Sequence, residues 1–195
     1  MKQNSELRQE ARNMLSGKWV MAALAAFVYL AITGAAGSIP DGGSAVTLLI
    51  LPIGYGLAVL FLKVFRGEEV NIGSLFDGFQ DYGRILGTAL LQAVYTVLWM
   101  LLLVVPGVVK SYSYAMTNYV LLEEPDLKFN AAIERSMAMM EGHKMRLFLL
   151  DLSFIGWALL SILTLGIGMF WLQPYVSTAH AAFYEDLKSN APVAA

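Results

Sequence analysis

Long apolar runs alternate with short polar segments along the chain, and their lengths predict membrane-spanning helices. A helix of about 20 apolar residues is long enough to cross the hydrocarbon core of a bilayer. Six runs are expected to cross: Trp19–Ala36, Ala45–Phe65, Ile85–Val105, Val108–Leu122, Leu147–Leu165 and Met169–Leu187. The fourth run, 108–122, is short and the least apolar. We expect it to cross because the basic segment after it would otherwise fall on the wrong side.

Turn-forming residues divide the six runs into three pairs. The segments Gly37–Ser44, Pro106–Gly107 and Thr164–Gly168 are rich in glycine and proline or break an apolar run. A turn at each place would join two spans into a hairpin with both ends on the same side of the membrane. The predicted fold class is therefore all-α, a single polytopic transmembrane domain over residues 1–195, and the last residues, 189–195, are expected to form a frayed tail.

A segment with helical periodicity precedes each hairpin. These segments are Ser5–Leu15, Ile72–Arg84 and Lys128–Glu141, and in the first of them Leu7, Ala11, Met14 and Leu15 share one face. This pattern predicts amphipathic helices lying on the cytoplasmic surface of the membrane. For the first segment, a solvated helical lead-in to the span is an equally good interpretation.

The arrangement indicates a threefold internal repeat, with pseudo-repeats over about 1–69, 70–124 and 125–187. A glycine and a base open each hairpin, and two acidic residues close it: Gly17–Lys18, Gly83–Arg84 and Gly142–His143–Lys144, against Glu68–Glu69, Glu123–Glu124 and Glu185–Asp186. Acids at a helix C-terminus oppose the macrodipole and call for a partner. We expect them to pair with the basic residues of adjacent hairpins in a cytoplasmic ring of charge, including Lys18, Glu68, Arg84, Glu123, His143, Lys144, Arg146 and Glu185. The alternative is that these charges are only solvated.

The distribution of basic residues gives the expected orientation. With six spans, Lys110 is the only one of the 13 Lys and Arg that falls on the opposite side from both termini. Short basic loops remain in the cytoplasm. Both termini are therefore expected to be cytoplasmic.

Composition excludes several classes of protein. Hydrophobic residues make up 57% of the chain and charged residues 14%, which favours a membrane protein. The net charge of −2 argues against a nucleic-acid partner, which requires a basic face. With no cysteine, two histidines and no recognisable catalytic motif, we expect neither a metal nor a cofactor, and no enzymatic activity.

Four polar residues inside the predicted spans are the candidate ligand-binding residues: Asp151, His180, Asn118 and Gln92. An ionisable group within a membrane is costly unless it is paired or hydrated, and it is a functional candidate for that reason. Asp151 and His180 occupy the two arms of the last hairpin and are positioned to face each other. The alternatives are that Asp151 reaches the interface or pairs with Arg146, and that His180 makes only a packing hydrogen bond.

Several short stretches give the chain a family resemblance. They are Arg66–Glu68, Leu75–Phe79, Pro106–Gly107, Tyr112–Tyr114, Met140–Lys144, Leu152–Trp157, Thr164–Gly168, Pro174–Tyr175 and Phe183–Glu185. Together they cover nearly the whole chain and resemble the bacterial membrane family catalogued as domain of unknown function 975. The resemblance implies an integral protein of the bacterial plasma membrane and supplies no activity.

Two functional hypotheses follow. In the first, the protein binds or moves a lipid or an amphipathic small molecule, with a polar pocket near Asp151 and His180. His143, Lys144 and Arg146 are candidates to bind a lipid phosphate. In the alternative, the surface helices dock a partner protein, or a second copy of the chain, as a regulatory module.

Overall fold

The computed structural model describes residues 1–40 and 43–190, and every regular element among them is a helix. The described chain forms two compact units that are interleaved in sequence. Unit 1 comprises residues 1–28, 60–72 and 145 onwards, and unit 2 comprises residues 29–59 and 73–144. The boundaries between them fall within α2 (Trp19–Gly37), α4 (Pro52–Phe65), the 3₁₀-helix η1 (Ile72–Phe79) and α9 (Lys144–Leu152).

Three helical segments are long and apolar enough to cross a membrane. They are α2, α5 (Tyr82–Leu102) and the segment Lys144–Leu163, which joins α9 (Lys144–Leu152) to α10 (Ile155–Leu163). These segments agree with three of the six predicted spans. α4 is apolar but has only 14 residues, and α11 (Met169–Asn190) has 22 residues but carries more polar groups. The remaining spans stay a prediction.

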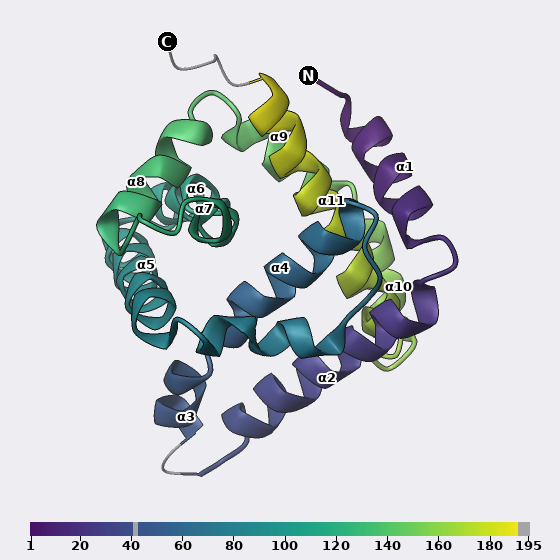
Figure 1. Ribbon diagram of the computed structural model, residues 1–195, viewed down its shortest axis with the longest axis horizontal. Coiled ribbons are helices and arrows are strands. Elements are labelled where there is room, and N and C mark those ends of the chain that lie inside the picture. Colours follow the sequence, from purple (N-terminus) through teal and green to yellow (C-terminus); the bar gives the residue numbers. More distant parts are fainter. Residues whose placement is uncertain (41–42, 191–195) are drawn as a thin grey trace. The chain divides into compact units, whose positions relative to one another are not determined.

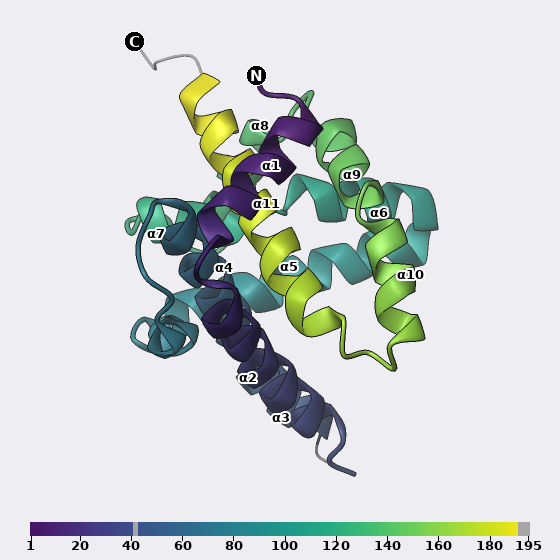
Figure 2. The same cartoon turned by 90° about the vertical axis from the view of Figure 1, so that its right-hand side faces the viewer.

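Unit 1 is built around α11, which has more buried residues than any other helix of the unit. α1 (Asn4–Leu15) packs along α11, and α10 packs against it on the other arm of the predicted hairpin (Figures 1 and 2). The backbone N–H of Gln3 donates to Glu6 Oε2 at 2.7 Å, which satisfies one of the free donors at the start of α1.

The apolar side of α1 is occupied by the protein itself. Leu7, Ala11 and Leu15 are fully buried, while Met14 is partly exposed. This burial corrects the expectation that the same face rests in a membrane surface. The physical reason is that the helical stripe meets the apolar side of α11 within unit 1, which removes it from water as effectively as lipid would.

Unit 2 contains six further elements. They are α3 (Gly43–Leu49), the 3₁₀-helix η1 (Ile72–Phe79), α5, α6 (Val104–Ser113), α7 (Thr117–Glu123) and α8 (Asn130–Met139). α5 packs against α6 and α8, and α7 packs against α8 (Figure 1). The core of the unit is formed by Tyr55, Val59, Ile85, Val120, Leu121 and Ala132.

Three predicted spans are interrupted. The fifth is interrupted at residues 153–154, between α9 and α10. The second consists of α3 and α4, which are separated immediately before Pro52, because proline cannot donate a helical hydrogen bond and clashes with the preceding turn. The fourth consists of α6 and α7 with a turn over residues 114–116. The Ile72–Arg84 segment, expected to be an amphipathic α-helix, forms η1 and the start of α5 instead.

The turns follow the predictions in one hairpin and depart from them in another. Residues 164–168 form the predicted turn, where Leu165 and Gly166 adopt positive φ angles of 54° and 87°. The predicted turn at Pro106–Gly107 is wrong, because both residues lie in α6 and the chain reverses at Leu103. Proline is tolerated in the first turn of a helix, which explains its place there. Residues 41–42 of the first predicted turn and 191–195 of the predicted tail lie outside the described residues.

Candidate functional site

A cavity of about 590 Å³ lies in unit 1, between α10, α11 and the connection from α1 to α2. Its walls are mainly apolar and aromatic: Trp19, Trp157, Leu160, Trp171, Leu172 and Tyr175, with Arg12, Ser161, Thr164 and Gly168. The volume is that of a small-molecule site. Trp157 and Trp171 are 51% and 50% exposed, so the cavity is open to the surroundings of the protein along these two side chains.

Tyr175 fixes the inner wall of this cavity. Its ring is 8% exposed and meets the ring of Phe154 edge-on at a centroid distance of 4.9 Å. Trp19 packs against it at 6.2 Å with an interplanar angle of 71°. Edge-to-face contacts of this kind are favourable beyond the area that they bury. They hold the aromatic wall in one arrangement.

The hydroxyl groups in the wall are already satisfied within the turn of the hairpin. Ser161 Oγ donates to the carbonyl of Trp157 at 2.9 Å, and Thr164 Oγ1 donates to that of Ser161 at 2.9 Å. Thr164 Oγ1 also accepts from the backbone N–H of Gly168 at 3.0 Å. The groups that would make this end of the cavity polar are therefore engaged, and the space favours an apolar chain.

A second, polar cavity of about 370 Å³ shares Arg12 and Tyr175 with the first. Its other lining residues come from α1: Ser5, Arg8, Gln9 and Asn13. The guanidinium of Arg12 lies over the ring of Tyr175, 5.7 Å from its centroid, in a cation–π contact. Arg12 and Tyr175 thus stand where an apolar space meets a polar one. We call the two cavities together the amphipathic site.

Two of the predicted ligand-binding residues meet in unit 1. His180 Nε2 lies 2.6 Å from Asp151 Oδ1, which is the contact expected between the two arms of the hairpin. Their side chains are 28% and 31% exposed, so the pair is neither sealed in the core nor free in solvent. Neither residue lines the amphipathic site. A ligand-binding role for this pair stays a prediction.

The other two predicted residues, Gln92 and Asn118, lie in unit 2. They line a cavity of about 420 Å³ together with Leu51, Gly54, Tyr55, Ile85, Ala89, Ala93, Thr96 and Val97. The four polar residues therefore form two separate pairs, one in each unit. Among the described residues, no group of three His, Asp or Glu side chains is placed to hold a metal ion.

The comparison with known protein families assigns the C-terminal part of the chain. Residues 100–191 match the family model described as a protein of unknown function, DUF975. This match supports the predicted resemblance to the DUF975 family over that part of the chain. No curated protein and no solved structure matches it. The DUF975 match includes α10, α11, Asp151 and His180, whereas Arg8, Arg12 and Trp19 precede it.

The basic residues that open the first two predicted hairpins contact backbone carbonyls near the ends of those hairpins. Lys18 Nζ donates to the carbonyls of Gly67, at 3.2 Å, and Glu68 beyond the end of α4. Arg84 Nη1 donates to the carbonyls of Leu121 and Leu127 at 3.1 and 3.2 Å. A cation at a helix C-terminus satisfies free carbonyls and complements the macrodipole. Lys18 and Arg84 therefore bind these carbonyls, whereas the sequence predicted pairs with the acidic residues of adjacent hairpins.

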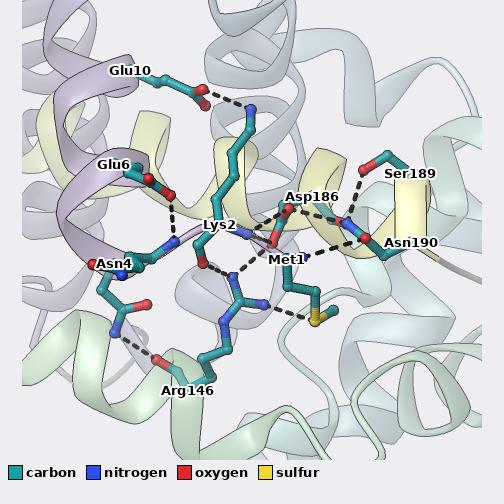
Figure 3. Close-up of polar contacts among 10 residues, drawn as sticks. Met1, Lys2, Asn4, Glu6, Glu10, Arg146, Asp186, Ser189 and Asn190 are labelled. Carbon is teal, nitrogen blue, oxygen red and sulfur yellow. Dashed lines mark hydrogen bonds and ion pairs between the residues drawn. The ribbon is translucent and has the colours of Figure 1, made fainter.

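In the third hairpin, Arg146 contacts a residue near the end of the hairpin, and Figure 3 shows its surroundings. Arg146 Nη2 lies 2.7 Å from Asp186 Oδ2, and the backbone N–H of Lys2 donates to both oxygens of that carboxylate. The Asp186 side chain is 2% exposed. Arg146 therefore pairs with Asp186, and the alternative partner considered for it, Asp151, pairs with His180. His143 and Lys144 precede this arginine at the start of α9.

The acidic residues of the predicted ring have different partners. Glu185 pairs with Arg66 at 2.7 Å, which links the third hairpin to the end of the first within unit 1. Glu124 pairs with Arg135 at 2.9 Å, and Glu123 is the last residue of α7. These contacts connect particular segments, and a closed ring stays a prediction.

Sequence reasoning missed the amphipathic site. Arg8 and Arg12 were interpreted only as charges that set the orientation, and Trp19 as the start of a span. The available signal was the spacing of four residues between the arginines, which places both on one side of a helix. Their proximity to Tyr175 depends on the packing of α1 against α11, which the local pattern does not specify.

Proposed function

We propose that this protein is a non-enzymatic integral membrane protein that binds or moves a lipid or another amphipathic molecule, and that the amphipathic site is where it binds. The observation that carries the proposal is the junction at Arg12 and Tyr175, where an apolar aromatic cavity meets a polar one. A ligand with a polar head and an apolar chain matches both parts. We place the protein in the bacterial plasma membrane, with six spans and both termini in the cytoplasm.

The aromatic residues suit this role. Trp and Tyr offer large apolar surfaces with one polar tip, and they are enriched where a protein meets the interface of a membrane. The partial exposure of Trp157 and Trp171 gives a hydrocarbon chain a lateral route into the cavity. A chain that entered there would follow α11 from Gly168 towards Tyr175, about 10 Å at 1.5 Å per residue.

The alternative, a module that docks a partner protein through its surface helices, has less support. Such docking uses the apolar face of an amphipathic helix. In α1 most of that face is buried against the protein itself, and in α8 the side chains of Ala132 and Ile133 are likewise buried. These two helices therefore offer a partner little apolar surface.

Native mass spectrometry of the detergent-purified protein tests the proposal. We expect the wild type to retain an amphipathic molecule and Trp157→Ala to bind it about tenfold more weakly, because about 1.4 kcal/mol of apolar contact is lost. Because Trp157 is half exposed, the substitution leaves the core intact. Trp99→Ala is the matched control, since Trp99 lies in unit 2 and lines neither cavity.

A wild-type protein without any bound amphiphile would contradict the proposal, and so would equal retention in Trp157→Ala. Loss of the ligand in Asp151→Asn with full retention in Trp157→Ala would instead place the site at the Asp151–His180 pair, as first expected from the sequence.

A further inference from the structure

Arg8 and Arg12 of α1 stand out among the cations of unit 1. They are four residues apart, so their side chains leave the helix on the same side, and both line the polar cavity. Arg12 also lines the apolar cavity. The polar half of the amphipathic site is therefore bordered by two permanently charged groups.

Neither arginine has a counter-charge within the part of the chain that the structure describes. Arg8 Nη1 donates to the carbonyl of Ser153, and Arg12 Nη2 to Tyr175 Oη, both at the long distance of 3.5 Å. Arg8 Nε is buried without any hydrogen-bond partner. A buried donor left unsatisfied is unfavourable, and a charged one more so.

Other cations of the same unit contrast with this pair. Lys2, Arg66 and Arg146 lie 2.6, 2.7 and 2.7 Å from the carboxylates of Glu10, Glu185 and Asp186.

The acids on α1 lie outside the lining of the polar cavity. Glu10 Oε1 pairs with Lys2, Glu6 accepts the backbone N–H of Gln3, and Glu10 Oε2 is buried without a hydrogen-bond partner. Among the described residues no carboxylate lines the polar cavity. Two positive charges thus face a polar space that holds no protein anion, next to an apolar one.

We infer that the amphipathic ligand carries a phosphate ester head, which Arg8 and Arg12 bind while its apolar chain lies among Trp19, Trp157 and Trp171. This inference rests on the proposed function and names its ligand class, a lipid or other long-chain alkyl ester of phosphate with a net negative charge. The planar guanidinium matches phosphate oxygens with paired donors, and these charge-assisted bonds are stronger than neutral ones. A phosphate oxygen would also give the buried Nε of Arg8 a partner.

The test is a competition in native mass spectrometry between phosphatidylglycerol and phosphatidylcholine with identical acyl chains. We expect the wild type to retain the anionic lipid at least tenfold better than the zwitterionic one. Arg8→Gln and Arg12→Gln should each weaken retention of phosphatidylglycerol about tenfold and leave phosphatidylcholine unchanged. Lys128→Gln is the matched control, because it removes one exposed positive charge in unit 2 that lines neither cavity.

Two soluble competitors, octyl phosphate and inorganic phosphate, show whether the site requires an apolar chain as well as a phosphate group. Octyl phosphate should displace phosphatidylglycerol, because it carries both the head and a chain, and inorganic phosphate at the same concentration should not. Displacement by inorganic phosphate would overturn the inferred need for a chain. Failure of octyl phosphate to compete would restrict the site to membrane lipids and overturn the broader ligand class.

The outcomes also separate this inference from the proposed function. Equal retention of the two lipids by the wild type, or full retention of phosphatidylglycerol in both arginine variants, would overturn the anionic head while Trp157→Ala could still lose the ligand. A protein that holds no amphiphile would overturn both. Arg12 is exposed and the contacts of Arg8 are long, so thermal unfolding of the two variants should match that of the wild type.

Discussion

Replacing Gly56 with alanine is expected to lower the free energy of unfolding by about 3 kcal/mol, the upper end of the usual cost of overpacking. A Cβ at this position would lie 2.0 Å from the carbonyl oxygen of Leu75 and 2.7 Å from its Cα. Both contacts are with the backbone, so no side-chain rotation can relieve them. α4 and η1 would have to separate, and the gain of about 1 kcal/mol in helix propensity does not offset that cost.

The same helix supplies the control. Gly54 also lies in α4, and a Cβ there would meet nothing within 4 Å. Gly54→Ala should therefore leave the stability unchanged or raise it by up to about 1 kcal/mol. Thermal unfolding of both variants in detergent is the measurement, with a decrease in Tm of roughly 5–10 °C expected for Gly56→Ala alone. Similar Tm values for the two variants would show that α4 and η1 do not approach so closely.

Asp186→Ala is expected to destabilise unit 1 by about 3 kcal/mol. The substitution removes a buried carboxylate that accepts from Arg146 and from the backbone N–H of Lys2. Arg146 is only 21% exposed, so its charge would remain largely buried without a partner. Breaking a buried pair by removing one member costs about 3–5 kcal/mol, and the residual exposure of Arg146 favours the lower value.

The neighbouring acid provides a comparison under the same charge change. Glu185 pairs with Arg66, but these side chains are 27% and 35% exposed. Glu185→Ala should therefore cost no more than about 1 kcal/mol. If thermal unfolding showed that Asp186→Ala and Glu185→Ala lose equal stability, the buried pair would contribute no more than the exposed one. Adding Arg146→Met to Asp186→Ala should recover part of the stability, because the unpaired charge is then removed.

The local pattern of apolar and polar residues was sufficient to predict that the chain is helical and where its long apolar segments lie. Trp19–Gly37, Tyr82–Leu102 and Lys144–Leu163 are predominantly apolar segments, and their length is a property of the sequence alone. The turn at residues 164–168 could also be predicted, since its glycines readily adopt positive φ angles. The contact between Asp151 and His180 followed from hairpin connectivity, because the turn fixes which residues of the two arms lie opposite each other.

Other features depended on competition between neighbouring elements. Pro106 and Gly107 have the composition of a turn, yet they belong to α6. A Cβ at Gly107 would lie 2.4 Å from the side chain of Met100, so this glycine serves the close approach of α5 and α6. The alternative uses of a glycine, as a turn or as a contact point, have the same local sequence.

The sequence determined an all-helical chain whose residues 100–191 match the DUF975 family, with apolar segments long enough to span a membrane. What only the tertiary structure decided is which polar groups meet. Arg12 reaches Tyr175, 163 residues further along the chain, because α1 buries Leu7, Ala11 and Leu15 against α11. Hydrophobic burial is non-directional, so a periodic apolar face predicts that a helix will pack but not which helix it will meet.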